Sequence, residues 1–215
     1  MGIFIGLYYI LRSILLRGLI NTILLFKDER QYENALGIQT AEFKKSKSPD
    51  FFHYQGAGYA LLYKILPEVF LLSGNLPFVD IGSGKGRALF VAEQCGFINL
   101  SGIELDESLV AGALINLKQY KPKHAGSEFH FVCANALDYP YPNQKAVYFL
   151  FNPFSEVVLK QVVASILKNT QHQTWIIYMN PKYNKAIETQ GFTIQKTFKT
   201  RFYTEAIVYL HQPKA

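Results

Sequence analysis

The chain has 215 residues, of which 49% are hydrophobic and 15% aromatic, and its formal net charge is +6. This length and composition predict one globular domain with a full hydrophobic core and exclude an intrinsically disordered chain. The basic residues are scattered, and the densest group (Lys44, Lys45 and Lys47) is expected to lie in a solvated loop, so charge alone does not indicate a nucleic-acid partner. The two cysteines, Cys95 and Cys133, lie in apolar stretches and predict core thiols, with neither a disulfide nor a metal site.

Residues 1–27 form an apolar segment that is interrupted by Arg12, Arg17 and Asn21. No basic residue precedes the apolar run and no small-residue cleavage site follows it, so a cleaved signal peptide is not expected. No uncharged stretch reaches the roughly 20 residues that a membrane span needs. On a helical wheel the polar side chains gather opposite a row of leucines, which predicts an apolar helix that is either interfacial at a membrane or docked on protein.

Residues 28–50 are more polar and predict a linker with about one helical turn. Residues 51–59 are rich in aromatic side chains and glycine. They lead into a helix predicted over residues 58–72, where large apolar side chains recur at the spacing of a core-facing helix.

The most informative stretch is residues 78–87, Phe-Val-Asp-Ile-Gly-Ser-Gly-Lys-Gly-Arg. Residues 76–81 predict a short buried strand and residues 87–95 have helical spacing, so the glycines lie in a turn from a strand to a helix N-terminus. Glycine allows positive φ and a close approach of the backbone to a ligand. Eighteen residues past Gly86, Glu104 ends the next apolar stretch, where a carboxylate can accept hydrogen bonds from two ribose hydroxyls. The pairing predicts a nucleotide-type cofactor site.

The spacing of the glycines distinguishes between cofactors. A dinucleotide-binding turn has its third glycine at the position that Arg87 occupies here. The turn also opens with Asp80, which would repel a pyrophosphate but suits a ligand with an ammonium group, such as S-adenosylmethionine (SAM). The motif resembles that of the class I SAM-dependent methyltransferases, and the residues that carry the resemblance are Asp80, Gly82, Gly84, Gly86 and Glu104.

This resemblance implies a set of cofactor contacts. Asp80 is expected to hold the ammonium group of SAM, the backbone of Gly82, Ser83, Gly84 and Gly86 to line its methionine portion, and Glu104 to hold its ribose. Asn135 and Ala136 occupy the place where the family has an acid and a small residue against adenine, and an amide oxygen can also accept a hydrogen bond from the adenine amine. Arg87 is expected to pair with Asp80 or with a carboxylate of the cofactor.

In the same family the segment before the first strand packs over the cofactor and the substrate pocket. The resemblance therefore makes Tyr54, Gln55 and Tyr59 candidate pocket residues. The alternative is that these aromatic side chains fill the core.

The rest of the chain alternates between strands and helices. Strands are predicted at 99–104, 128–133, 147–151 and 175–179, with helices at 107–120, 155–168 and 182–190 and two final β-stretches at 192–198 and 205–211. We expect an α/β fold with a doubly wound, seven-stranded, mostly parallel sheet that ends in an antiparallel strand pair. The domains expected are an apolar helix at 1–27, a linker at 28–50 and a methyltransferase domain at 51–215.

Residues Phe151, Asn152, Pro153 and Phe154 follow a predicted strand and resemble the Asn/Asp-Pro-Pro-Tyr/Phe motif of amino-group methyltransferases, with one proline missing. The resemblance implies catalytic roles for three of them. The side-chain oxygen of Asn152 and the carbonyl of Pro153 would accept hydrogen bonds from the target nitrogen, and Phe154 would stack on the substrate. The alternative is a turn that ends the strand and begins the next helix.

These motifs together resemble small bacterial methyltransferases related to the seven-strand, non-SET protein-lysine methyltransferases. The function implied is methyl transfer from SAM to an amine nitrogen, with protein lysine favoured as the acceptor. The alternatives are a nucleic-acid or small-molecule methyltransferase and a non-catalytic SAM-binding module associated with a membrane. The core thiols indicate a reducing compartment, and Lys27 and Arg30, which follow the apolar segment, would keep the body cytoplasmic if that segment did insert. We therefore expect a cytoplasmic protein, with peripheral contact of residues 1–26 at the inner face of a membrane as one option.

Overall fold

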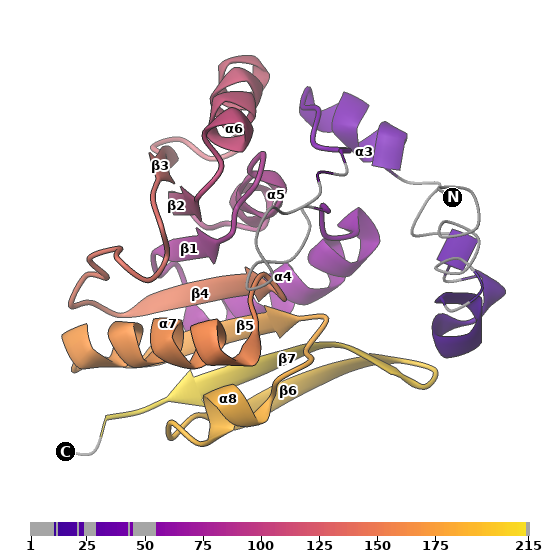
Figure 1. Ribbon diagram of the computed structural model, residues 1–215. Helices are drawn as coiled ribbons and strands as arrows, with labels where there is room; N and C mark the ends of the chain where they lie inside the picture. Colours follow the sequence, from indigo (N-terminus) through magenta and orange to yellow (C-terminus); the bar gives the residue numbers. More distant parts are fainter. Residues whose placement is uncertain are drawn as a thin grey trace.

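The computed structural model describes residues 11, 13–20, 22–23, 29–42, 44 and 55–213. These residues form one seven-stranded sheet with helices on both faces (Figure 1), and the strand order is β3-β2-β1-β4-β5-β7-β6. The first five strands run parallel, and β7 is antiparallel to both of its neighbours, β5 and β6. The predicted doubly wound sheet with a terminal antiparallel pair is confirmed.

The elements agree with the predicted ranges to within a few residues at each end. The strands are β1 (Phe78–Ile81), β2 (Asn99–Glu104), β3 (Glu128–Cys133), β4 (Ala146–Phe151), β5 (Thr174–Met179), β6 (Thr193–Thr200) and β7 (Tyr203–His211). The helices are α3 (Glu29–Leu36), α4 (Tyr59–Ser73), α5 (Arg87–Gln94), α6 (Glu107–Gln119), α7 (Glu156–Asn169) and α8 (Lys185–Glu188).

The central strands are apolar because both of their faces are covered. Every residue of β5 is buried, as are all but the last of β4, which is typical of parallel strands under helices on two sides. Two long helices begin at side-chain caps. Asp106 accepts hydrogen bonds from the backbone of Ser108 and Leu109 at the start of α6, and Ser155 accepts one from Val158 at the start of α7.

Two hydrophobic cores lie on opposite faces of the sheet. Helices α4 and α5 contribute to the core that contains Phe78 and Phe149, and α7 and α8 contribute to the core that contains Tyr148 and Tyr178. Cys95 is partly buried, as expected, but Cys133 is exposed, because it is the last residue of β3 at the edge of the sheet.

The N-terminal third differs from the prediction in two places. The stretch expected to be a linker contains α3, a helix of eight residues where about one turn was expected. The described residues among 11–23 are helical, but the helix is interrupted at Gly18, where φ is +88°. Among the residues that the structure describes, no helix is both long and apolar enough to cross a membrane.

Candidate functional site

The predicted cofactor and acceptor motifs meet at one edge of the sheet. Strand β1 pairs in parallel with β2 on one side and with β4 on the other, so the carboxyl ends of these three strands lie next to one another. Asp80, Glu104 and Asn152 belong to, or directly follow, these ends. The carboxyl edge of an open α/β sheet is where ligands bind in this architecture.

The turn after β1 has the backbone that its glycines predict. Gly82, Gly84 and Gly86 have φ values of +82°, +54° and +85°, and Gly86 is the residue before the first turn of α5. A side chain at these three positions would be strained. The amides of Gly82 and Ser83 donate to the carbonyl of Ile103 at 2.8 and 3.1 Å, which ties the turn to β2.

Glu104 joins the glycine turn to the loop after β2. One carboxylate oxygen, Oε2, accepts a hydrogen bond from the amide of Gly84 at 2.8 Å, and Oε1 accepts one from the amide of Asp106 at 2.9 Å. Each carboxylate oxygen has a second lone pair, so both can also accept from a hydroxyl. The backbone thus holds Glu104 in place as an acceptor beside the turn.

Asp80 lies beneath the same turn and is only 3% exposed. Burial raises the pKa of its carboxyl well above the ordinary value, and the negative charge of Glu104 raises it further. Two carboxyl groups that disfavour each other's charge create a site where a cation is stabilised. This is the environment expected for the ammonium group of SAM.

Two local features fit a cofactor at this position. The hydroxyl of Ser83 is buried and has no hydrogen-bond partner among the described residues. A β-carbon on Gly82 would lie 3.0 Å from Cβ of Pro153, so the turn and the segment after β4 are in contact. The residues present therefore fit SAM: acids for its ammonium group and ribose, and a glycine turn whose backbone a ligand can approach closely.

Asn135 and Ala136 follow β3, next to β2 in the sheet. The side-chain oxygen of Asn135 accepts a hydrogen bond from the amide of Leu137 at 3.1 Å, and Ala136 is buried, with its carbonyl bonded to the hydroxyl of Tyr141 at 2.8 Å. The side chain of Asn135 therefore stabilises the turn in which it lies. Its side-chain NH₂ group and one lone pair of Oδ1 can still bind a ligand.

Asn152 is held in a defined orientation at the end of β4. Its φ of +42° is unusual for a residue with a side chain, and its Oδ1 accepts a hydrogen bond from the hydroxyl of Tyr178 at 2.9 Å. That hydroxyl also accepts from the amide of Lys182 at 3.4 Å, and burial raises the pKa of Tyr178 to about 12, so it stays protonated and donates. Tyr178 was not identified from the sequence, because an apolar strand with one tyrosine gives no signal for this role.

Phe154 does not lie beside Asn152 as an open stacking surface. Its ring is buried, 3% exposed, in the core between the sheet and α7. Phe154 directly precedes Ser155, the N-cap of α7, and its ring packs inward at the start of the helix. The expectation that Phe154 stacks on the substrate is therefore not supported by its position.

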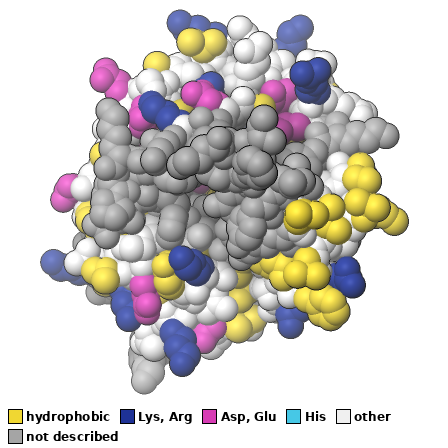
Figure 2. Space-filling model, turned by 45° about the vertical axis from the view of Figure 1, so that its right-hand side comes forward, with side chains coloured by type: hydrophobic (Ala, Val, Ile, Leu, Met, Phe, Trp, Pro, Cys, Tyr) yellow, Lys and Arg dark blue, Asp and Glu magenta, His cyan; other side chains and the backbone are white. Residues whose placement is uncertain are grey.

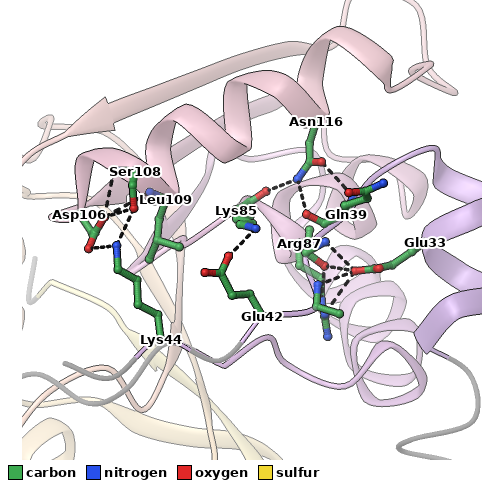
Figure 3. A network of polar contacts seen from close by, with 12 residues as sticks. Glu33, Gln39, Glu42, Lys44, Lys85, Arg87, Asp106, Ser108, Leu109 and Asn116 are labelled. Atoms are coloured by element: carbon green, nitrogen blue, oxygen red, sulfur yellow. Dashed lines mark hydrogen bonds and ion pairs between the residues drawn. The ribbon is translucent and has the colours of Figure 1, made fainter.

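Arg87 points away from Asp80. Its guanidinium pairs with Glu29 at 2.7 Å and with Glu33 at 3.5 Å, and it donates to the hydroxyl of Thr40 at 2.6 Å. Figure 3 shows it on the side of the turn that faces the N-terminal segment. The expected pairing with Asp80 is thus not formed: Arg87 is buried and attaches residues 29–42 to the first turn of α5.

Two further ion pairs hold the same segment across the cofactor turn (Figure 3). Glu42 pairs with Lys85 of the turn at 2.5 Å, and Lys44 pairs with Asp106 at 2.5 Å. Hydrogen bonds from Lys44 and Ser108 lower the pKa of Asp106 to about 2. Lys44 was expected in a solvated loop, and instead it contacts the N-terminus of α6. We call residues 38–42 and 44, with these contacts, the strap.

The three candidate pocket residues have different surroundings. Tyr59 is 2% exposed, its ring stacks on Tyr32, and its hydroxyl lies 3.1 Å from that of Thr40. It fills the core, as the alternative interpretation states, and the guanidinium of Arg87 covers its ring at 4.5 Å. Gln55 is exposed, and Tyr54 lies outside the described residues.

The described residues contain no group of three or more histidine, cysteine, aspartate or glutamate side chains that could hold a metal ion. Neither a protein-family model nor a curated protein matches the sequence. Solved structures do match the fold. Magnesium protoporphyrin IX methyltransferase from Synechocystis, with bound SAM, is 14% identical with a TM-score of 0.56 over 71% of this chain and 79% of that one.

Two other matches act on different classes of molecule. A protein of Pyrococcus horikoshii proposed to methylate RNA is 15% identical, with a TM-score of 0.57 over 86% of this chain and 96% of that one. A ribosomal protein L11 methylase from Lactobacillus delbrueckii is 13% identical, with a TM-score of 0.53 over 75% of this chain and 81% of that one. The matches share the class I methyltransferase fold, and their acceptors range from a porphyrin to RNA and protein.

Proposed function

We propose that this chain, which has the fold of the class I SAM-dependent methyltransferases, is an enzyme that binds SAM and transfers its methyl group to an amine nitrogen, with protein lysine as the favoured acceptor. The observation that carries the proposal is the contact between the two motifs. Pro153, next to Asn152, lies against Gly82 of the cofactor turn, so the residue expected to hold the acceptor is beside the site expected to hold SAM.

SAM, when bound, supplies an activated methyl group. The chain contributes binding and alignment: Asp80 and Glu104 hold charged and hydroxyl groups of the cofactor, and the backbone of the turn from Gly82 to Gly86 lines its methionine portion. Asn152 Oδ1, oriented by Tyr178, accepts a hydrogen bond from the acceptor N–H and so directs the nitrogen lone pair toward the cofactor side of the site.

Several features support an amine acceptor. A side-chain amide oxygen stabilises the positive charge that develops on a nitrogen as it is methylated, and Asn152 presents one at the required strand end. Among the described residues the catalytic domain carries no separate unit for reading a nucleic-acid sequence. The resemblance of the Asn152 motif to amino-group methyltransferases points the same way.

The proposal includes peripheral contact of residues 1–26 with a membrane. Its support is that apolar side chains of this segment are exposed in the structure, among them Leu15 and Leu19.

The acceptor class is tested by incubating the full chain with methyl-labelled SAM and a cell extract. We expect label in protein, removed by protease and not by nuclease, and recovered as methyl-lysine after acid hydrolysis. Asn152→Ala is the control, and its label should fall to background. Nuclease-sensitive label would make the chain a nucleic-acid methyltransferase, and label in small molecules would make it a metabolite enzyme.

A non-catalytic SAM-binding module gives a different result in the same assay. The wild-type chain would bind SAM but transfer no methyl group to any fraction, and Asn152→Ala would not differ from it. That outcome would overturn the enzymatic proposal while leaving the cofactor site intact.

A further inference from the structure

The N-terminal segment leaves large apolar side chains in solvent. Leu15, Leu19 and Ile20 are 69%, 58% and 74% exposed. Leu11 and Ile23 are 57% and 50% exposed. Figure 2, which brings this side of the molecule forward, shows hydrophobic side chains gathered at its right-hand edge. Contiguous exposed apolar surface of this kind marks an interaction site rather than ordinary protein surface.

The polar side of the same segment faces the protein. Ser13 and Thr22 are buried, with their hydroxyl oxygens 3.0 Å apart. The Arg17 guanidinium makes two hydrogen bonds to buried Glu205, at 2.7 and 3.1 Å, and covers the ring of Tyr203 at 4.1 Å. A helix that packs on a water-soluble body normally turns its apolar side inward. In this segment the polar side faces the protein and the apolar side faces solvent, so the apolar side is suited to bind another partner.

The tip of the β6–β7 hairpin completes the same face. Phe202 is 78% exposed, and its amide donates a hydrogen bond to the carbonyl of Leu16 at 3.2 Å, which places the tip beside the N-terminal segment. The neighbouring Arg201 has its guanidinium 5.0 Å from the Phe202 ring. We call the exposed side chains of both elements the apolar flank; they are Leu11, Leu15, Leu19, Ile20, Ile23 and Phe202.

The charged side chains that are exposed at the hairpin tip, beside Phe202, are basic. Arg17 and Lys196 are paired with Glu205 and Glu68, so the basic residues that face solvent at the tip are Lys199 and Arg201. In the sequence, residues 1–27 contain three basic residues and no acidic one. An apolar face with basic residues and an aromatic tip is suited to the interface of a membrane that contains anionic lipids.

We propose that the apolar flank binds the surface of an anionic lipid bilayer, with its aliphatic side chains and Phe202 inserted at the headgroup boundary. This deepens the membrane contact proposed above and is independent of methyl transfer.

The apolar flank also lies close to the acceptor side of the site. Arg17 covers Tyr203, and the Tyr203 hydroxyl contacts the side chain of Asn180, which directly follows β5. Two residues earlier, Tyr178 holds Asn152. Membrane-bound protein would therefore hold Asn152 on the side of the molecule that carries the apolar flank, where an acceptor attached to the membrane can reach it.

The test is co-sedimentation of the full chain with vesicles of phosphatidylcholine, alone or mixed with phosphatidylglycerol. We expect binding to the mixed vesicles, weaker binding to phosphatidylcholine alone, and a decrease with added salt. The variant Leu15→Ser/Leu19→Ser/Phe202→Ser should bind about 10-fold or more weakly, because three large apolar side chains are lost from the face. Leu71→Ser, at an exposed leucine of α4, is the matched control and should bind like the wild type.

Further measurements on the triple variant distinguish loss of membrane binding from loss of folding or of dimer formation. Thermal unfolding of the triple variant should match the wild type, because its three sites are exposed. Equal vesicle binding by the triple variant would overturn the proposal. The proposal would also be overturned if the wild type bound no vesicles but formed a dimer in sedimentation velocity, and the triple variant did not. The apolar flank would then be the contact between two copies of the chain. SAM binding, measured on the same samples, reports separately on the cofactor site.

Discussion

At the scale of single residues, the buried carboxyl of Asp80 is expected to affect both stability and cofactor binding. Its ionised form is disfavoured by burial and by Glu104, so Asp80→Asn should raise the unfolding free energy of the protein without cofactor at neutral pH. The same change removes the charge that holds an ammonium group, so SAM binding should weaken. Urea unfolding and calorimetry on the two proteins measure both effects. A variant that loses stability would show that the carboxylate has a structural partner.

The pH dependence of stability follows from the same shift. A carboxyl whose pKa is raised in the folded state favours folding when it is protonated. Its contribution is therefore complete below the ordinary carboxyl range and is lost as the pH rises through the raised pKa. The difference in unfolding free energy between wild type and Asp80→Asn should widen from pH 4 toward neutral pH. A constant difference would contradict the assignment.

Asn152 and Tyr178 are expected to affect catalysis and not cofactor binding. Asn152→Ala should lower the rate of methyl transfer about 100-fold or more, because the group that meets the acceptor is gone. Tyr178→Phe keeps the ring in the core but removes the hydrogen bond that orients Asn152, and about a 3- to 10-fold loss is expected. The SAM dissociation constants of both variants should stay near that of the wild type. A Tyr178→Phe rate equal to the wild type would remove Tyr178 from the mechanism.

Residue roles were predictable where a backbone pattern dictates them. Gly82, Gly84 and Gly86 have positive φ, and Glu104 contacts the turn, because glycine spacing and a strand-end acid are local features of the sequence. The position of Arg87 was not predictable. The two acids that pair with it and the hydroxyl of Thr40 come from residues more than 40 positions away, and only the fold shows that they meet Arg87.

At the scale of elements, the attachment of α3 and the strap to α5 depends on Arg87. Arg87→Leu leaves Glu29 and Glu33 without their cation and should cost about 3–5 kcal/mol of unfolding free energy. Lys160→Leu breaks an exposed pair with Glu156 on α7 and should cost less than about 0.5 kcal/mol. Chemical denaturation compares the two. Equal losses would show that the buried network contributes no more than a surface pair.

Helix α5 is also held at its other end, by Glu93. Burial alone would raise the pKa of this carboxyl, but hydrogen bonds from Tyr120, from Ser127 and from backbone amides outweigh burial and lower it. A lowered pKa stabilises the fold above the ordinary glutamate pKa, and the contribution is lost as the pH falls from there through the lowered pKa of the folded state. Glu93→Gln should cost about 2 kcal/mol at pH 7 and progressively less below pH 4.5, by urea titration.

The elements themselves were predictable because their patterns are local. Strands β2 and β3 have the predicted bounds, and Ser155 caps α7 as expected. Helix α3 was missed, because its polar sequence has few core-facing residues, and its Glu29 and Glu33 are satisfied by Arg87 from another element. The sequence also did not predict that the polar side chains of residues 13–22 face the protein. Arg17 is held there by a buried acid from a distant element, Glu205 on β7.

At the scale of the whole molecule, the fold, the glycine turn and the strand-end residues describe one site. The parallel order β2-β1-β4 places the Asp80 turn between Glu104 and Asn152, so the cofactor acids and the proposed acceptor residue share one sheet edge. The alternation of strands and helices was sufficient to predict this arrangement. The chemistry of the acceptor was not predictable at this level, because the same fold serves porphyrin, RNA and protein methyltransferases.

The most direct test of this account is a calorimetric titration of the full chain with SAM, beside Glu104→Gln and the exposed control Asp138→Asn. We expect saturable binding with one site per chain, about 10-fold or more weaker in Glu104→Gln and unchanged in Asp138→Asn, because Glu104 would lose charge-assisted hydrogen bonds to the ribose. A folded wild-type chain that binds no SAM, or a Glu104→Gln variant that binds it as tightly as the wild type, would contradict the assignment of this sheet edge as a SAM site.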